Sequence, residues 1–505
     1  MAEATSHPPD GDDPAAREPA TRSVRSAAVW AMGSQYTGFV IQFITSVIIS
    51  RFFLAPDEVG LFSIALAAAM MVAVLQDFGL TRYITGLARL DHEETARCSS
   101  VAVVFSWTVG LAIAAASPAV ASFYGHADLL PILLIIALSY GFSAFSIMPV
   151  ALLSREMAFG RLFVVNVSSA FVQGGVAIGM AMAGFSALSL AWAMVASAAI
   201  RAIAGQALRP ALPFPPRFDG LAEVLRFGSQ SSYLFIIGAV GSRSADLIVG
   251  KFLSLAATGI YTRSTGLASQ LRTLVSGGIG SVVYPSFARI QRRGGSLAEP
   301  YLKVVACFTA STWPVMAGLA IGAEPLVESL FGPRWIAVAP ILQLIAISEM
   351  LFEALPMQME IPILHGEMKK LTRRNILDTI VSVTLLIAGA MVSVEMAAVS
   401  RIAYAAIWIF IYVFFICGLI DLSPLRLVRI YAKGLVATVA AIVPLSIAAL
   451  VMPDFRYCGI ATLGSFALMG APLWLAALWL LRHPLWDEIV SIGSGFALRL
   501  RARQA

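Results

Sequence analysis

The feature that most constrains this chain is a series of apolar segments, each about 20 residues or longer, that recurs along nearly its whole length. A helix of that length crosses the hydrocarbon core of a bilayer. Only 13% of the 505 residues are charged and 59% are hydrophobic, so the chain cannot give itself an ordinary polar surface. We therefore expect an all-α polytopic membrane protein with about fourteen transmembrane helices.

The apolar segments fall into two sets of six, followed by two further helices. They lie at 26–51, 59–82, 99–123, 128–153, 162–183 and 185–208; at 227–251, 257–287, 302–322, 337–364, 375–392 and 396–420; and at 431–451 and 458–481. These positions predict six regions. They are a disordered tail (1–24), an N-lobe (25–209), an amphipathic cytoplasmic linker (210–226), a C-lobe (227–420), two additional helices (421–482) and a basic tail (483–505).

Basic residues alternate between the two sides of the expected membrane. With the N-terminus inside, nearly all of them fall in cytoplasmic segments, around 17–25, 82–97, 155–161, 209–226, 289–303, 369–374, 426–433 and 482–503. The opposite loops hold only Arg51, Lys251, Arg334 and Arg456. By the positive-inside rule, both termini are expected in the cytoplasm. The basic residues behind the net charge of +6 then lie in loops next to anionic lipid headgroups, and we expect no nucleic-acid partner.

Several classes of protein lack their sequence signatures here. No GxxxxGK[ST] loop is present, which argues against transport driven by the chain's own ATP hydrolysis. The four cysteines lie far apart, without the spacing of a zinc site or a disulfide framework. No nucleophile motif accompanies an acid/base pair. We therefore expect no enzymatic activity, no metal and no cofactor, and a first helix that is not a cleaved signal peptide.

Two pairs of segments indicate an internal duplication. Residues 53–63 (FLAPDEVGLFS) align with 252–262 (FLSLAATGIYT), which places Gly60 over Gly259. Residues 152–162 align with 363–373 in the same order, with a Glu-Met pair in register. Each copy then contains six helices. Because six is even, the copies share one orientation and are related by an axis along the membrane normal.

Segments in both halves resemble one transporter family. FFLAPDEVGLFSIAL, QDFGL and ALLSREMAFGRL in the first half, and GIYTRSTGLASQL, VVYPSFARIQ and LVESLFGPRWIAVAPILQLIAI in the second, resemble the Wzx-type oligosaccharide-lipid flippases. These form the polysaccharide-transport branch of the superfamily that also holds multidrug/toxin extruders and lipid II flippases. The resemblance covers residues 25–420 and implies two six-helix lobes around a central cavity.

The resemblance also implies a function. The expected substrate is an oligosaccharide repeat unit joined through pyrophosphate to a polyprenol, flipped across the bacterial inner membrane by alternating access for surface polysaccharide biosynthesis. Besides membrane lipids, the implied partners are a polysaccharide polymerase and a chain-length regulator, and we expect a monomer. Two alternatives stay open: a cation-coupled multidrug extruder of the same fold, and a membrane enzyme of polysaccharide assembly. The first would favour an acidic cavity and the second a large periplasmic loop.

Five arginines lie within the expected spans: Arg201, Arg243, Arg263, Arg272 and Arg401. A charged residue at the centre of a lipid-exposed helix costs about 2.5–3.5 kcal/mol, so each must face a cavity, pair with an acid or reach the interface. Arg201 is near enough to the inner interface to snorkel. The other four lie in the second half, where guanidinium groups could bind a diphosphate.

The arginines of the second half also have alternatives. Asp246 follows Arg243 by three residues, so an ion pair on one helical face is the competing interpretation. Arg263 and Arg272 are nine residues apart, on opposite faces of an ideal helix. Either that helix bends, for example around Gly266, or only one of the two lines the cavity.

Acidic residues gather in one expected span of the second half. Glu349 and Glu353 are one turn apart, Glu360 returns to nearly the same face, and Pro356 and Pro362 are expected to kink the helix. Carboxylates stacked in a low dielectric favour the protonated form. These three residues and Asp246 are therefore candidates for cation coupling or for ion pairs with the arginines. Asp77 and Asp378, near cytoplasmic ends, are interpreted as interfacial residues.

Overall fold

A computed structural model describes residues 18–73, 92–212, 241 and 243–491, and these residues are almost entirely helical. The helices of the first half are α1 (Glu18–Phe52), α2 (Pro56–Ala73), α4 (His92–Tyr124), α5 (Leu129–Arg155), α6 (Phe159–Met182) and α7 (Leu188–Leu208). Those of the second half begin with residues 243–252 and continue with α9 (Leu255–Arg292), α10 (Ala298–Ile321), α11 (Ala323–Phe331), η3 (Pro333–Trp335), α12 (Val338–Phe352), α13 (Glu360–Leu364), α14 (Met368–Ala390) and α15 (Val394–Leu419). The chain then forms α16 (Pro424–Val451), η4 (Phe455–Tyr457) and α17 (Ile460–Leu480).

Some sequence-based expectations fall outside the described residues. They are the tail up to residue 17, the end of the second span with Asp77, most of the linker, the start of the seventh span, and the end of the basic tail.

Local sequence explains several helix boundaries. Pro56 opens α2 and is followed by Asp57 and Glu58, and an acidic first turn complements the helix dipole. The Glu58 carboxylate also accepts a hydrogen bond from the backbone N–H of Ala55 at 2.7 Å. Ser254 caps α9, where its hydroxyl accepts a hydrogen bond from the N–H of Ala257 at 3.1 Å.

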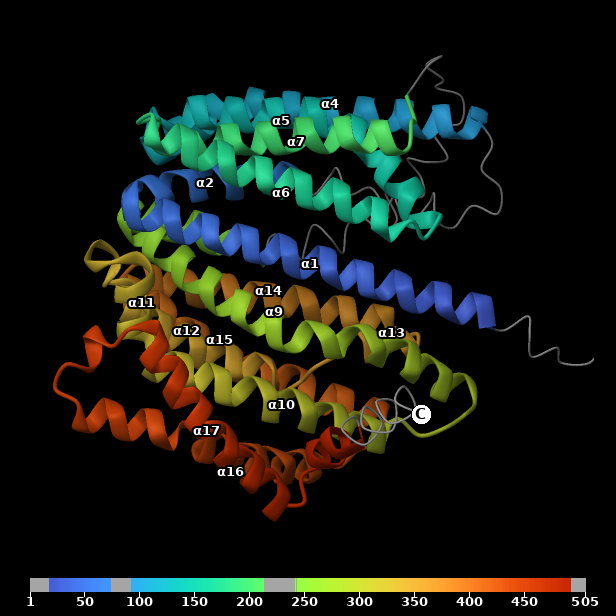
Figure 1. Cartoon of the computed structure of the whole chain (residues 1–505), viewed down its shortest axis with the longest axis vertical. Helices are drawn as coiled ribbons and strands as arrows, with labels where there is room; N and C mark the ends of the chain where they lie inside the picture. Colours follow the sequence, from blue (N-terminus) through green and yellow to red (C-terminus); the bar gives the residue numbers. More distant parts are fainter. Residues whose placement is uncertain (1–17, 74–91, 213–240, 242, 492–505) are drawn as a thin grey trace, which may run out of the picture.

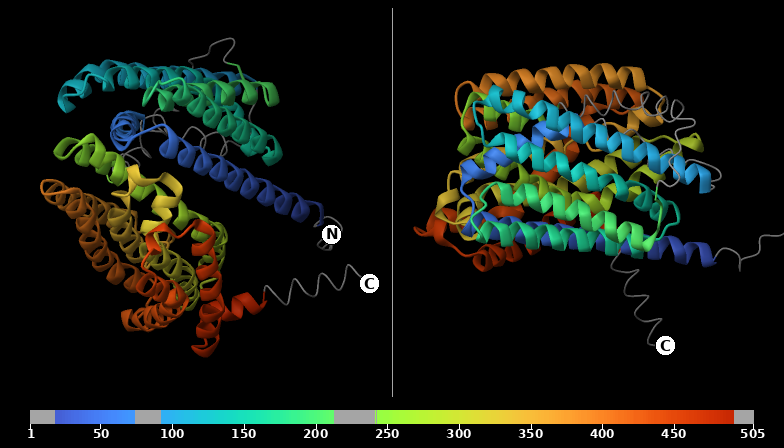
Figure 2. Two further views of the ribbon diagram at one scale, coloured as in Figure 1. Left: turned by 60° about the vertical axis from the view of Figure 1, so that its left-hand side comes forward. Right: turned by 90° about the horizontal axis from the view of Figure 1, so that it is seen from above.

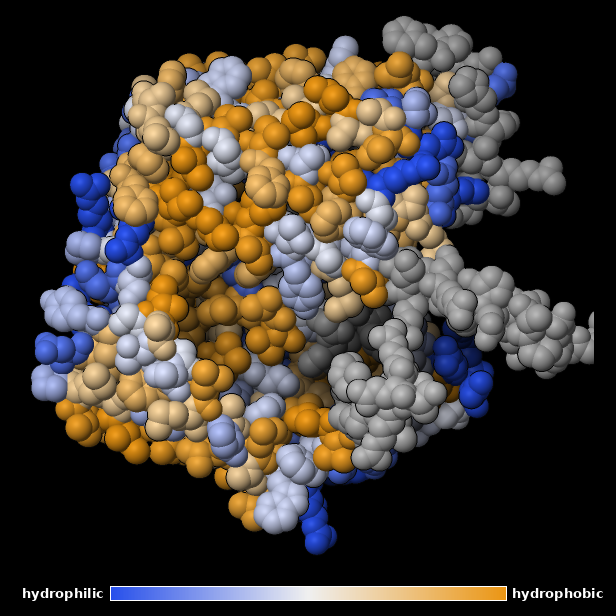
Figure 3. Space-filling view, viewed as in Figure 1, coloured by the Kyte–Doolittle hydropathy of each residue, from blue (hydrophilic) through white to orange (hydrophobic). Residues whose placement is uncertain are grey.

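The described helices have the composition of membrane spans. Ten of them are long and apolar enough to cross a bilayer. Figure 3 shows a broad apolar surface with strongly polar residues gathered at the two ends of the helices. The expected all-α multi-pass membrane architecture is therefore confirmed, whereas the total of about fourteen spans and the cytoplasmic termini stay predictions. In the second half, α9, α12 and α14 are among the described helices that fall short of the criteria for a span.

The helices form two bundles that lie side by side (Figures 1 and 2). In the first half, α5 packs between α4 and α7, and α6 packs between α7 and α1. In the second half, α12 packs against α9, α10 and α15, and α14 packs against α15. Helix α16 covers α10, and α17 packs on α16 at the edge away from the first half (Figure 1). The two last helices are thus an addition to the second bundle.

The two halves meet where α2 crosses α9. A Cβ atom added to Gly60 would lie 1.8 Å from the carbonyl oxygen of Leu255, and one added to Gly259 would lie 1.9 Å from that of Pro56. The alignment of the two copies that pairs Gly60 with Gly259 also pairs Pro56 with Leu255. The contact is therefore reciprocal, as a two-fold relation between the halves requires, and only glycine allows this approach of the two backbones.

Further contacts join the halves at the same end of the molecule, where α1 and α4 finish. The indole of Trp335 donates to the carbonyl oxygen of Ser50 at 2.8 Å, and Arg51 donates to that of Ser329. Tyr124 donates through its hydroxyl to the carbonyl oxygen of Leu247 at 3.0 Å. With the N-terminus in the cytoplasm, this end would face the periplasm.

Candidate functional site

The described residues of the second half line an open cavity of about 1060 Å³. Its lining comes from Gly241, Arg243, Ala245 and Asp246, and from α9, α10, the segment from α12 to α13, α14 and α15, all on the C-terminal side of residue 240. Helices α9, α12 and α14, which are too polar or too short to count as spans, are all in this wall. A helix that faces a polar cavity need not be apolar on every side, which explains the composition of α9 and α14, whereas α12 is apolar and only too short.

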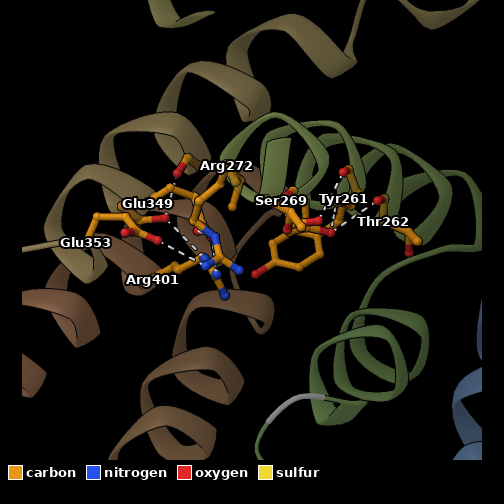
Figure 4. Close-up of polar contacts among 12 residues, drawn as sticks. Tyr261, Thr262, Ser269, Arg272, Glu349, Glu353 and Arg401 are labelled. Carbon is orange, nitrogen blue, oxygen red and sulfur yellow. Dashed lines mark hydrogen bonds and ion pairs between the residues drawn. The ribbon is translucent and has the colours of Figure 1, made fainter. Parts of the chain in front are cut away.

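Two arginines and two glutamates form one ion-pair cluster in the wall (Figure 4). Glu349 of α12 bridges both arginines: Nε of Arg272 lies 2.9 Å from its Oε2, and Nη2 of Arg401 lies 2.6 Å from its Oε1. Glu353 lies 3.0 Å from Nη1 of Arg272 through its Oε1. The carboxylate side chains are 5% and 8% exposed, whereas Arg272 is 36% and Arg401 28% exposed. Most of the exposed side-chain surface of the cluster therefore belongs to the two arginines.

The break after α12 fixes one side of this cluster. The sequence predicts a continuous span over 337–364 with a kink. In the structure α12 stops at Phe352, Met357 adopts a positive φ of 59°, and the helix resumes at Glu360. Glu353 is the C-cap residue at the break. Pro356, which cannot donate a backbone hydrogen bond to continue the helix, accounts for the interruption.

Neighbouring side chains orient Arg401 of α15. Its Nε donates to the hydroxyl of Ser348 at 3.1 Å. Its guanidinium carbon lies 5.1 Å from the ring centroid of Phe352, a cation–π arrangement. Both neighbours are on α12, so this helix supplies the counterion, the hydrogen-bond acceptor and the aromatic face. Sequence spacing could not pair Arg401 with Glu349, because the contact depends on how α12 and α15 pack.

Three other site candidates also line the cavity. Arg243 is exposed in the wall, and Glu360 lies at the start of α13. Asp246 accepts a hydrogen bond from the hydroxyl of Thr262 at 2.7 Å. The structure therefore gathers seven of the eight candidates around one cavity and supplies Thr262 as a hydrogen-bonding partner for Asp246.

Arg263, the eighth candidate, does not line this cavity. Its guanidinium carbon lies 5.6 Å from the ring centroid of Phe331 and 5.4 Å from that of Trp335, and its Nη1 donates to the hydroxyl of Ser46 on α1. Arg263 thus joins the two halves near the α2–α9 crossing. Of the two candidate arginines on α9, Arg263 and Arg272, only Arg272 faces the cavity, which matches their positions on opposite helical faces.

Other polar residues of the cavity include Asn375 and Tyr404, which no sequence pattern indicated, and Asp378, which was expected at the interface. Asn375, Asp378 and Tyr404 line the wall, and the hydroxyl of Tyr412 donates to Oδ1 of Asn375 at 2.5 Å. Asp378 was interpreted as interfacial because the apolar run begins at residue 375. Helix α14 begins at Met368, which places Asp378 about 15 Å along the helix instead. The helix continues through a run of basic residues that hydropathy alone assigns to a loop.

Comparisons with known proteins agree with this architecture. The model of a family described as polysaccharide biosynthesis protein matches residues 26–340. The succinoglycan biosynthesis transport protein ExoT of Rhizobium meliloti is 27% identical over 351 residues, which cover 67% of this chain and 68% of that protein. The lipopolysaccharide biosynthesis protein WzxC of Escherichia coli is 22% identical, with 57% and 60% covered. The teichuronic acid biosynthesis protein TuaB of Bacillus subtilis is also 22% identical, with 46% and 48% covered, so the aligned part spans from about half to two thirds of these relatives.

Solved structures share the fold. The lipid II flippase MurJ in an inward closed conformation superposes with a TM-score of 0.72 at 10% identity, over 92% of this chain and 99% of that one. An inward-facing multidrug resistance transporter of the MATE family gives 0.53 at 15% identity, over 76% and 95%. At these identities the likeness concerns the fold alone. The family match over most of the chain is more direct, and it confirms the resemblance in the sequence: this chain belongs to the polysaccharide biosynthesis protein family of membrane transporters.

Proposed function

We propose that this protein is a secondary transporter that flips polyprenyl-pyrophosphate-linked oligosaccharide repeat units across the bacterial inner membrane, for the synthesis of exopolysaccharide, capsule or O-antigen. The observation that carries the proposal is the cavity among membrane-spanning helices whose wall presents Arg272 and Arg401 on its accessible side. The names of the relatives, which describe polysaccharide transport and biosynthesis rather than enzymatic activity, support the same substrate class.

The arginines suit a diphosphate. A guanidinium has five N–H donors in a planar fork that matches phosphate oxygens. Nη1 of Arg272 donates to Glu353, and Nε lies 2.9 Å from Glu349 without the geometry of a hydrogen bond, which leaves Nη2 for a ligand. The pyrophosphate would bind these groups, with Arg243 as a further cation in the wall. The sugars would occupy the rest of the cavity and the polyprenol would stay in lipid.

The contacts between the halves suit alternating access. They concentrate at the end where Gly60 meets Gly259 and where Arg263 reaches Ser46, and the cavity lies farther along α9, around Arg272. In our proposal the repeat unit enters while this end is closed. The repeat unit leaves after the two halves separate at this end and come together at the opposite end. The two-fold relation between the halves pairs Gly60 with Gly259. In our proposal this contact would be the last one to separate.

The partners are part of the same proposal. A polysaccharide polymerase and a chain-length regulator would act on the flipped repeat unit, and the transporter would work as a monomer. Coupling to a cation gradient through Asp246, Glu349, Glu353 or Glu360 also stays a prediction. Their positions in the cavity wall support it.

Deletion and complementation in the host test the proposal. Loss of surface polysaccharide, with lipid-linked repeat units accumulating on the cytoplasmic side, is the expected phenotype. Wild type should restore polysaccharide, whereas well-expressed Arg272→Ala and Arg401→Ala should not. Arg456→Ala is the matched control, because Arg456 pairs with Glu328 outside the cavity at 3.3 Å. Normal polysaccharide in a deletion strain without a second flippase would rule out the role, and drug-efflux assays would then test the extruder alternative.

A further inference from the structure

The ion-pair cluster in the cavity is electrically balanced. The positive charges of Arg272 and Arg401 face the negative charges of Glu349 and Glu353 at 2.6–3.0 Å. The diphosphate of a polyprenyl-linked sugar is a diester with two negative charges. Bringing it to the guanidinium groups would place it next to two carboxylates as well. Like charges repel strongly at such short separations when little water lies between them.

The carboxylates are held in place rather than free to move aside. Their side chains are 5% and 8% exposed, and both glutamates lie on or directly after α12, which packs against α9, α10 and α15. The remaining way to remove the repulsion is to add a proton. We propose, on the basis of the function proposed above, that binding of the diphosphate draws one proton from water onto Glu353 and that its departure releases this proton.

The geometry selects Glu353 over Glu349. Glu349 uses both of its oxygens, one for each arginine, so loss of its charge would weaken two ion pairs. Glu353 pairs with Arg272 alone among the described residues. Once protonated, Glu353 no longer competes for Nη1 of Arg272, and its hydroxyl becomes a donor toward a phosphate oxygen. The cluster then carries one net positive charge when the dianion arrives.

The other titratable and charged groups around Glu353 come from every helix packed on it. They are Tyr261 and Arg272 of α9, Tyr301 of α10, Glu349 and Glu360 of its own segment, Asp378 of α14, Arg401 and Tyr404 of α15, and Tyr431 of α16. Glu360 and Asp378 are therefore the competing proton acceptors, and both need a control.

Calorimetry on the purified full-length protein tests the inference. The probe is a short-chain citronellyl diphosphate linked to one sugar, a diester whose phosphates do not titrate between pH 5.5 and 8.5. Titrations at one pH in buffers of different ionisation enthalpy count the protons taken up. Wild type is expected to take up one proton per ligand, and its affinity should rise up to about tenfold for each pH unit of acidification.

Glu353→Gln keeps the shape of the side chain and removes the titration. It should bind the probe with no proton uptake and with an affinity that no longer changes with pH, and at pH 8 it should bind at least as tightly as wild type. Glu360→Gln and Asp378→Asn are the matched controls and should retain the uptake. Probe binding without proton uptake by wild type would overturn the inference, as would full uptake by Glu353→Gln. If wild type and Arg272→Ala both fail to bind the probe at every pH, the proposed function itself fails.

The measurement on wild type does not depend on any variant. If Glu353→Gln does not fold, proton uptake by wild type that disappears in Glu360→Gln or Asp378→Asn would overturn the assignment to Glu353, and uptake that persists in both would support it.

Discussion

Gly60 of α2 and Gly259 of α9 hold equivalent positions in the two halves, and each lies against the first turn of the other's helix. A Cβ atom on either would approach a backbone carbonyl oxygen to 1.8 or 1.9 Å. This distance is far below any van der Waals contact, and backbone atoms cannot swing away as a side chain can. The crossing is thus a point where sequence duplication, close packing and the contact between the halves coincide.

Gly60→Ala should force α2 and α9 apart and so weaken closure at this end. Overpacking typically costs about 1–3 kcal/mol, which is enough to shift a two-state equilibrium about tenfold. Spin labels would be attached to cysteines introduced at Phe52 and Tyr457 in a cysteine-free background. Double electron–electron resonance should give longer distances between the labels in Gly60→Ala than in the protein with Gly60. Gly179→Ala in α6 is the control, because nothing lies within 4 Å of a Cβ at that position. An unchanged distance distribution in Gly60→Ala would contradict the role of the crossing.

Arg263→Ala should impair transport without impairing ligand binding. Its guanidinium lies outside the cavity, against Trp335 and Ser46. Affinity for a diphosphate-linked sugar should therefore stay within about twofold of wild type, whereas flipping in proteoliposomes should fall about tenfold or more. Those factors correspond to about 0.4 and 1.4 kcal/mol. Arg272→Ala should show the opposite pattern and lose binding. If Arg263→Ala loses binding as well, Arg263 contacts the substrate in another state of the transporter.

Removing one partner of the buried cluster should destabilise the protein. Arg272→Ala leaves the carboxylate of Glu353 uncompensated, and breaking a buried ion pair in this way costs about 3–5 kcal/mol. The double variant Arg272→Ala/Glu353→Ala should recover most of the thermal stability, measured by unfolding in detergent, but not the transport. Recovery of both would show that the arginine acts through structure alone.

The segment after α17 should loosen at mildly acidic pH. Burial is the main reason that the pKa of His483 is lowered from 6.5 to about 4, and Lys433 lowers it further. The folded state therefore holds this imidazole neutral, while the unfolded segment takes up a proton below its ordinary pKa. Stability from this group is complete above about pH 6.5 and is lost as the pH falls toward 4. The protection factors of residues 483–491 in hydrogen exchange, which correct for the intrinsic rate at each pH, should therefore fall over that range.

His483→Asn should remove most of this pH dependence, because asparagine does not titrate. The variant should show exchange rates in the same segment that change only with the intrinsic chemistry of exchange. A wild-type profile identical to that of the variant would rule out the histidine as the cause.

Local patterns in the sequence were enough for the helical class of the protein and for parts of the site. Apolar runs of span length require helices in a bilayer, because every backbone polar group must be satisfied within its own segment. Helical periodicity likewise placed Glu349 and Glu353 on one face and Arg263 and Arg272 on opposite faces, as the structure has them. These properties depend on residues within a few turns of each other.

Tertiary packing decided the rest. Only the packing of α12 against α15 brings Glu349 to Arg401, and only the approach of α1 gives Arg263 a partner in Ser46. Asp378 lies in the cavity wall because α14 continues through basic residues whose charge suggested a loop. The sequence by itself determines which face of its helix a residue occupies, because that follows from the 3.6-residue turn. What that face meets depends on contacts between distant segments, which no local pattern records.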